Sequence, residues 1–205
     1  ATRSRRVSTT DAARAISALR TAYRALTAQL TLYSDATPDT LVTTTALDGT
    51  IQAQSIGYQP KDIYEDRALW GLPAGPEAKA VWLPRGIVIP WQIEGGLWRI
   101  NIRRPVTAKE IAAGEPKYIG PAGFANALYN ADAIAENKPV LLVEGEIDAM
   151  TAFQEAPDLV AAVASGSTAG ARREPWISRL AAAPCVLLAF DCDANGAGEM
   201  AAAWW

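Results

Sequence analysis

Two short groups of acidic residues carry the clearest chemistry in this 205-residue sequence. In the first, Asp148 follows Glu144 by four positions, and in the second a single residue separates Asp191 from Asp193. Carboxylates that are brought together repel one another unless a cation neutralises them. Oxygen ligands favour Mg²⁺ or Mn²⁺ over zinc, and two such ions suit in-line phosphoryl transfer. We therefore expect these acids to converge on divalent metal ions.

The histidine and cysteine content excludes other kinds of site. The chain has no histidine and two cysteines, Cys185 and Cys192. Zinc sites of the Cys/His type and Ser-His-Asp or Cys-His catalysis are therefore closed to this chain alone. Because the sequence offers no further cysteine, we expect both to be reduced thiols.

The acidic groups follow apolar runs that are typical of buried parallel strands. From residue 139 onward, aliphatic runs alternate with helical segments, the pattern of a parallel sheet. The predicted elements are strands 139–143, 159–163 and 185–190 and helices 146–155, 171–182 and one from about 196. Ligands of such sheets bind at the carboxyl ends of the strands, where both acidic groups lie.

The region 51–121 has short apolar runs among Gly, Pro and Trp residues. Three strands are predicted to form an antiparallel meander with a Glu-Gly-Gly hairpin turn: 80–83, 86–91 and 97–104. In the last strand, Trp98, Ile100 and Ile102 are expected to pack while the alternate residues present cations. Upstream, we expect a tail over 1–9, a helix with one apolar stripe over 11–32, and a linker over 34–50.

Charge is unevenly distributed, although the formal net charge is only -3. Six arginines stand against one acid through residue 24, whereas 137–161 holds five acids and one lysine. Basic flanks and an acidic centre suit a protein that holds metal ions and phosphates, with ordinary solvated faces as the alternative. No run is long enough to span a membrane, and the basic start is not followed by the apolar stretch of a signal peptide. We expect a cytoplasmic protein.

The acidic groups belong to an ordered set of motifs. Val-Glu-Gly-Glu-Ile-Asp-Ala occupies 143–149, Ser-Gly-Ser-Thr-Ala-Gly occupies 165–170, and Phe-Asp-Cys-Asp-Ala-Asn-Gly-Ala-Gly occupies 190–198. The first and last resemble the two signatures of the Toprim domain, shared by DNA primases, topoisomerases and some nucleases. Further segments resemble, in the right order, the bacterial and phage primase catalytic core: 55–58, 85–90, 116–119 and 126–130.

This resemblance covers roughly 51–205 and implies an α/β fold with a parallel-sheet Toprim domain over 137–205. A smaller, mixed α+β basic subdomain would precede it over 51–136, after the tail, helix and linker of 1–50. Family members carry a further acidic motif downstream, which this sequence does not reach, and a zinc-binding domain whose cysteines and histidines are missing here. We therefore expect a Toprim domain incomplete at its carboxyl end, and activity of this segment alone stays open.

The resemblance also implies a role for each matching residue. Glu144, Asp191 and Asp193 would hold the metal ions, with Asp148 as an auxiliary acid. Glu144 would also help to activate the primer 3′-hydroxyl.

Cations of the basic subdomain would hold the template backbone or the incoming triphosphate. The candidates are Arg103, Arg104 and Lys117, with solvated surface charges as the alternative, and Arg85 unless it only flanks a strand. The loop 165–170 leads into a helix and either contacts phosphate or is a tight connection. Four tryptophans are either core residues or stacking surfaces for a single strand: Trp70, Trp82, Trp91 and Trp98.

The implied activity is that of a DNA primase, a nucleotidyltransferase that makes short RNA primers on a DNA template during phage or mobile-element replication. Its implied cofactor is Mg²⁺ or Mn²⁺, with no zinc, and its implied partners are single-stranded DNA, nucleoside triphosphates and a replicative helicase, with no membrane. Two alternatives stay open: a Toprim nuclease that hydrolyses phosphodiesters, and a nucleic-acid or nucleotide-binding module without catalysis.

Overall fold

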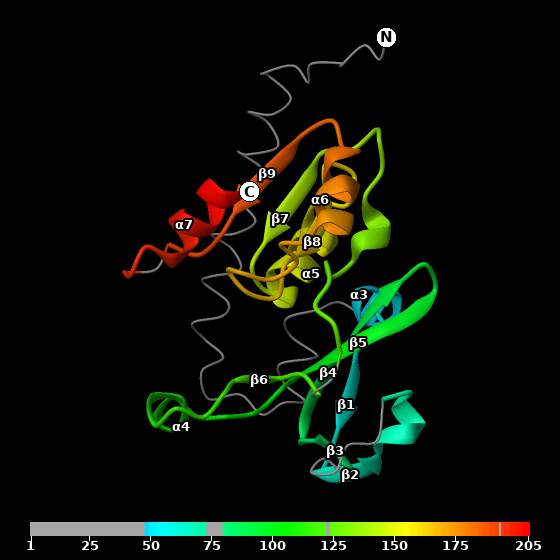
Figure 1. Ribbon diagram of the computed structural model, residues 1–205, viewed down its shortest axis with the longest axis vertical. Coiled ribbons are helices and arrows are strands. Elements are labelled where there is room, and N and C mark those ends of the chain that lie inside the picture. The colour runs from blue at the N-terminus through cyan, green and yellow to red at the C-terminus, as the bar shows by residue number, and fades with distance from the viewer. Residues whose placement is uncertain (1–47, 73–79, 122–123, 193) are drawn as a thin grey trace. The chain divides into compact units, whose positions relative to one another are not determined.

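The computed structural model describes residues 48–72, 80–121, 124–192 and 194–205 (Figure 1). The tail and helix expected before residue 33, most of the linker, and Asp193 lie outside these residues. Contacts divide the described chain into two compact units. One, here called the parallel unit, comprises Gln92–Glu94 and Asn126–Trp205, and the other, the antiparallel unit, comprises 48–91 and Gly95–Ala125.

The parallel unit is built on a three-stranded parallel sheet. Its strands are β7 (Val140–Val143), β8 (Ala161–Ala164) and β9 (Val186–Ala189), in the order β8-β7-β9. Val143 of the central strand pairs with Ala164 on one side and with Ala189 on the other. The strands therefore end level with one another, and whatever follows them lies along one edge of the sheet.

Helices connect these strands in the order that the sequence predicts. They are α5 (Glu146–Glu155), α6 (Glu174–Ala181) and α7 (Ala197–Trp204), and a short 3-10 helix η2 (Ala131–Ala133) precedes β7. All residues of β7 and β8 are buried, whereas Leu188 of β9 is exposed. Aliphatic strands in the middle of the sheet thus supply the core, and α5 packs against both β7 and β8.

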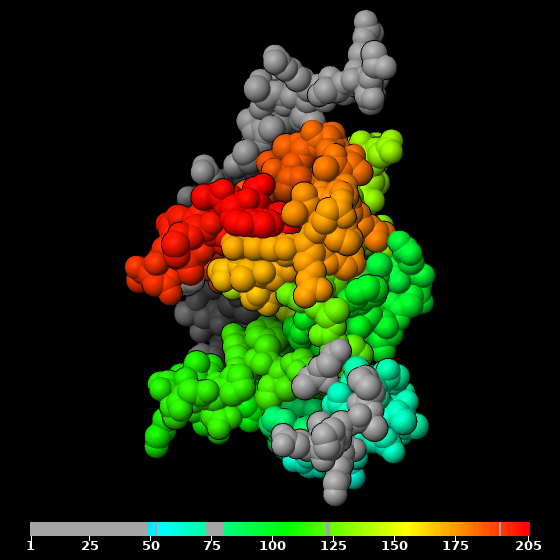
Figure 2. All heavy atoms as spheres, viewed as in Figure 1, coloured from blue at the N-terminus to red at the C-terminus, as the bar shows by residue number. Residues whose placement is uncertain are grey.

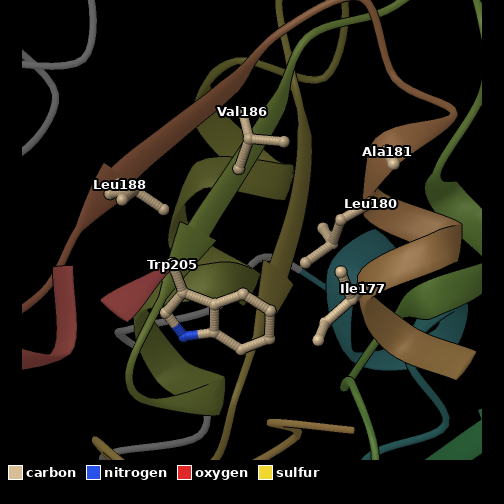
Figure 3. Close-up of a pocket in the computed structure, with 6 residues that line it drawn as sticks. All are labelled: Ile177, Leu180, Ala181, Val186, Leu188 and Trp205. Carbon is tan, nitrogen blue, oxygen red and sulfur yellow. The ribbon is translucent and has the colours of Figure 1, made fainter. Parts of the chain in front are cut away.

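An open apolar hollow lies between α6 and β9 (Figure 3). Ile177 and Leu180 line it from the helix, Val186 and Leu188 line it from the strand, and the Trp205 indole lies across it. This contact attaches the end of the chain after α7 to the α6 side of the sheet.

The antiparallel unit contains two sheets. The larger has the order β1-β4-β5-β6, and the smaller pairs β2 with β3. Its elements are α3 (Asp48–Ala53), β1 (Gly57–Gln59), β2 (Ile63–Asp66), η1 (Arg67–Trp70), β3 (Ala80–Leu83), β4 (Gly86–Ile93), β5 (Gly96–Arg103), α4 (Ala108–Ala112) and β6 (Tyr118–Ile119). Its core joins β3 to β5 through Val81, Leu83, Ile100 and Ile102.

The expected three-stranded meander is wrong at its first strand. β3 pairs with β2 rather than with β4. The strand ends before Pro84-Arg85, where the Arg85 backbone N–H donates to the Asp62 carboxylate rather than to a neighbouring strand. The hairpin between β4 and β5 forms as predicted, and both Glu94 and Gly95 have positive φ, as a tight hairpin turn requires.

The expected packing of β5 also differs from the structure. Ile100 and Ile102 are buried, but Trp98 is 42% exposed, and Asn101 on the alternate face is buried. Asn101 is covered because the Arg99 guanidinium donates to its Oδ1, while Arg99 itself stacks on the ring of Trp91. Arg99 and Asn101, on the alternate face of β5, thus form a hydrogen bond with each other, so this face does not only present charge to solvent.

The α/β fold class is confirmed, with a parallel sheet in one unit and a mixed α+β arrangement in the other. Cys185 and Cys192 are both thiols without a disulfide, as expected. Among the described helices, none has the length and apolar character needed to cross a membrane.

Candidate functional site

The acids of the two motifs follow neighbouring strands. Glu144 comes directly after β7, and Asp191 comes two residues after the end of β9. Because Val143 and Ala189 are paired across the parallel ladder, both acids emerge at the carboxyl edge of the sheet. This edge is the candidate metal centre.

The Glu-Gly-x-x-Asp spacing has a clear structural reason at this edge. Glu144 is half-buried, with its Oε2 atom fully covered. Gly145 caps α5, and Asp148 stands one turn into the helix, which brings its side chain back over the glycine. A Cβ atom on Gly145 would lie 2.9 Å from Asp148 Oδ2, so glycine leaves the room that this carboxylate occupies.

Asp191 is exposed, and its main chain packs closely on α7. Gly198, in the first turn of α7, is buried against the Asp191 backbone, and any Cβ there would collide with the Asp191 carbonyl. The Gly-x-Gly after the second acidic motif therefore allows α7 to approach the loop that carries Asp191.

All of these donors are carboxylate oxygens, the ligands that Mg²⁺ and Mn²⁺ prefer. Within the ranges that the structure describes, no three acidic or cysteine side chains lie close enough together to hold a metal ion. Asp193, the fourth predicted ligand, lies outside those ranges. The metal site therefore stays a prediction that rests on the strand-end positions of Glu144 and Asp191 and on the position of Asp148 in α5.

A buried pair beside this edge was not singled out by the sequence. Glu146, at the start of α5, is 3% exposed, and Tyr129 is 2% exposed. Burial raises the pKa of the Tyr129 phenol well above its ordinary value, and the nearby charge of Glu146 raises the pKa further. Tyr129 also forms a two-way backbone bridge with Ala164 at the end of β8. The pair thus joins the segment before β7 to the turn that carries Glu144.

The predicted cations lie in the antiparallel unit. Arg103 ends β5 and pairs with Tyr118 of β6. The guanidinium carbon of Arg103 lies 5.9 Å from the centre of the Tyr118 ring, and Lys117 Nζ lies 6.0 Å from it. Two positive groups therefore lie close to one half-buried aromatic ring, an arrangement suited to a phosphate backbone and its bases.

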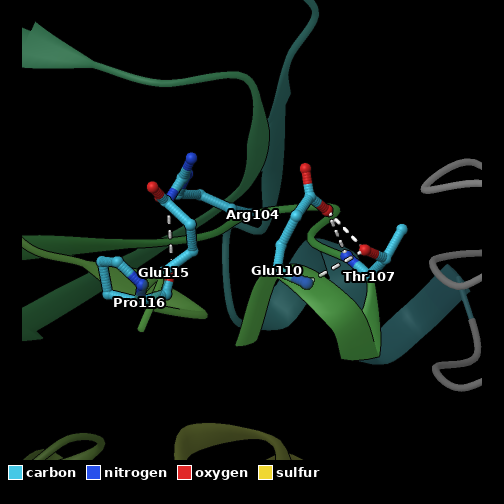
Figure 4. Close-up of polar contacts among 5 residues, drawn as sticks. All are labelled: Arg104, Thr107, Glu110, Glu115 and Pro116. Carbon is cyan, nitrogen blue, oxygen red and sulfur yellow. Dashed lines mark hydrogen bonds and ion pairs between the residues drawn. The ribbon is translucent and has the colours of Figure 1, made fainter. Parts of the chain in front are cut away.

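Arg104 forms its polar contacts with residues of the loop that follows it (Figure 4). Its Nη1 lies 2.9 Å from Glu115 Oε2 and donates to the Pro116 carbonyl, its backbone N–H donates to the Lys117 carbonyl, and its guanidinium lies over Trp82. These contacts close the loop between β5 and β6, within which Thr107 and Glu110 form a capping box at the start of α4. Arg104 thus supports the neighbouring Arg103 and Lys117.

The remaining candidates fall into different environments. Arg85 is exposed just before β4. Trp91 is fully buried and belongs to the core, whereas Trp98 is substantially exposed, with its indole N–H donating to the Ala125 carbonyl. Trp70 packs edge to face on Phe124. Of the four tryptophans, Trp98 presents the most open ring, while Trp91 is a structural residue.

The described chain thus combines a parallel sheet that has acids at its carboxyl edge with an antiparallel unit that bears two neighbouring cations, Arg103 and Lys117. Among solved structures, the chain is similar to the crystal structure of the Aquifex aeolicus primase, comprising its zinc-binding and RNA polymerase domains. The TM-score is 0.50, and 19% of residues are identical. The similarity covers 77% of this chain but 42% of that one, so the chain corresponds to less than half of its length.

Neither the comparison with family models nor the comparison with curated proteins gives a match. The structural similarity therefore establishes the fold, and the resemblance to a primase core seen in the motifs is confirmed at that level.

Proposed function

We propose that this chain is the catalytic core of a primase that synthesises short RNA primers from nucleoside triphosphates on single-stranded DNA. One observation carries the proposal: in a fold shared with a primase, β7 and β9 lie side by side and end level with one another, so that Glu144 and the Asp191 loop emerge at one edge. Divalent ions catalyse in-line phosphoryl transfer, and carboxylates gathered at one sheet edge would hold them.

Each group has a part in this proposal. Glu144, Asp191 and Asp193 would hold Mg²⁺ or Mn²⁺, with Asp148 behind them. A bound ion would polarise the reacting phosphate and activate the primer hydroxyl. Arg103 and Lys117 would hold template phosphates, and Arg104 would keep their loop in place through Glu115 and Trp82.

Calorimetry with Mn²⁺ and Mg²⁺ tests the metal site first. We expect Glu144→Gln and Asp191→Asn to weaken metal binding by at least about tenfold, because each removes one charged ligand. Asp158→Asn is the matched control, since Asp158 is an exposed acid of the same unit that precedes β8 rather than following a strand. Metal binding unchanged in both ligand variants would contradict the proposed site.

Incorporation of labelled ribonucleotides on a single-stranded template then tests the activity. We expect Glu144→Gln to lower it by about a hundredfold or more, as loss of metal catalysis predicts. Metal-dependent scission of labelled DNA without incorporation would instead identify a Toprim-type nuclease. Salt-sensitive binding without either reaction would identify a binding module.

A further inference from the structure

Arg172 carries a positive charge that no acid among the described residues of the parallel unit balances with an ion pair. It lies between β8 and α6, is half-buried, and its guanidinium carbon lies 4.8 Å from the centre of the Trp204 ring. Its Nε atom is buried, and among the described residues nothing accepts a hydrogen bond from it or forms an ion pair with this side chain. A half-buried guanidinium that has a buried Nε without an acceptor among the described residues can bind an anion.

The loop that carries Arg172 is held against the candidate metal edge. At its start, the Ser165 N–H donates to the Val143 carbonyl, and the Gly166 N–H donates to the Glu144 carbonyl at 2.8 Å. The loop then folds back, because Gly170 packs directly on the Ser165 carbonyl and leaves no room for a Cβ. Arg172 follows Gly170 by two residues, so it leaves the loop close to Ser165, where the loop begins.

The α7 helix fixes the direction of Arg172. Trp204 and Trp205 stack edge to face, with ring centres 5.0 Å apart, and Trp205 is anchored in the hollow between α6 and β9. Figure 2 shows the α7 side chains lying against the region of α6 and the loop before it. Stacking on Trp204 orients the planar guanidinium before any ligand arrives, which lowers the entropic cost of binding.

We propose that Arg172, assisted by the exposed Arg173, binds the triphosphate of an incoming nucleotide at the carboxyl edge of the sheet; this inference rests on the proposed function. The acids there would hold the metal ions that accompany the nucleotide, and a metal-bound triphosphate still carries negative oxygens. A guanidinium fork satisfies two of those oxygens at once. Carboxylates for the metals and an arginine for the phosphates are then provided by adjacent strand ends of one sheet.

Binding of Mn²⁺-ATP to the 205-residue chain, measured by calorimetry without template, tests this inference. We expect Arg172→Gln to raise the Kd about tenfold and Arg172→Lys to have a smaller effect, since lysine keeps the charge but loses the fork and the planar stack. Arg173→Gln, which removes an exposed side chain and leaves folding intact, should raise the Kd by a smaller factor. Lys138→Gln is the control, because Lys138 precedes β7 at the opposite edge and contacts the Pro157 carbonyl.

The outcomes separate this inference from the proposed function. Unchanged Kd values in the Arg172 and Arg173 variants, an equal loss in Lys138→Gln, or no ATP binding by the wild-type chain would each overturn it. Weaker binding of a single-stranded oligonucleotide with unaltered ATP binding would overturn it too and assign the loop to the template. Arginine-dependent ATP binding without any primer synthesis would support the inference while removing the primase proposal. Primer synthesis by the wild-type chain, with nucleotide binding unaltered in the arginine variants, would support the primase proposal and overturn the inference about Arg172.

Discussion

At the scale of single residues, Tyr129 is a polar side chain that the parallel unit buries in its core. Its phenol is buried near the Glu146 carboxylate, at the turn between β7 and α5. Burial first, and the negative charge of Glu146 second, raise the pKa of Tyr129. Both causes disfavour the phenolate, so the folded protein retains this proton at a pH where an unfolded chain releases it.

The consequence is a loss of stability at alkaline pH. Because the folded-state pKa is raised, the contribution of Tyr129 is fully present below the unfolded pKa of about 10 and declines above it, by up to about 1.4 kcal/mol for each pH unit. We expect the free energy of unfolding in urea to fall less steeply between about pH 10 and 12 in Tyr129→Phe than in the wild type. Tyr64→Phe is the control, since Tyr64 is 72% exposed. Parallel pH profiles for Tyr129→Phe and the wild type would contradict the argument.

The residue scale also shows where sequence reasoning stops. The spacing of Glu144, Asp148 and Asp191 indicates a metal site, because acids that directly follow apolar strands can be recognised from the sequence alone. Arg172 gave no comparable signal, because its aromatic partner Trp204 lies far along the chain on another helix. Tyr129 and Glu146 were missed for the same reason, since only folding brings a residue before β7 near the start of α5.

At the scale of elements, α7 and the Asp191 loop depend on one glycine. We expect Gly198→Ala to destabilise the protein by about 1–3 kcal/mol, the usual cost of overpacking a filled site. The same change should weaken metal binding, because the loop must move away from α7 to admit the methyl group. Thermal unfolding and Mn²⁺ calorimetry on one sample measure both effects.

Gly49→Ala provides the contrast at this scale. Gly49 lies in α3, and a Cβ there would meet no atom within 4 Å. Alanine is favoured over glycine in a helix by up to about 1 kcal/mol, so this variant should be neutral or more stable. Wild-type stability and metal affinity in Gly198→Ala would show that the Asp191 loop is not held by α7.

Element prediction succeeded where aliphatic runs were continuous and failed where polar strands took part. The runs that form β7 to β9 have no competing interpretation, and their order along the chain dictates a parallel sheet. β2, with the sequence Ile-Tyr-Glu-Asp, alternates half-buried and exposed side chains but is short and half acidic. Its pairing with β3 depends on Pro84 and on the Asp62 to Arg85 hydrogen bond, which no periodicity reveals.

At the scale of the whole molecule, the two units carry opposite chemistry. The parallel unit carries the acids proposed to bind metal, and the antiparallel unit carries Arg103 and Lys117, both close to the Tyr118 ring. Metal binding and single-strand binding should therefore be separable properties of one chain. Each can be removed by substitutions in its own unit.

Salt dependence of single-stranded DNA binding measures that separation. Each phosphate contact on a single strand contributes about 0.7 to the slope of log K against log salt. We expect the double substitution Arg103→Gln, Lys117→Gln to reduce the slope by about 1.4 in buffer without divalent ions, as the loss of two contacts predicts. Lys109→Gln, on exposed α4, should leave the slope close to that of the wild type, and Glu144→Gln should leave both slope and affinity unchanged.

If Glu144→Gln abolished binding in that buffer, or if the double variant kept the full slope, the single-stranded DNA would be held by groups other than Arg103, Lys117 and Tyr118. The division of labour between the two units would then be wrong.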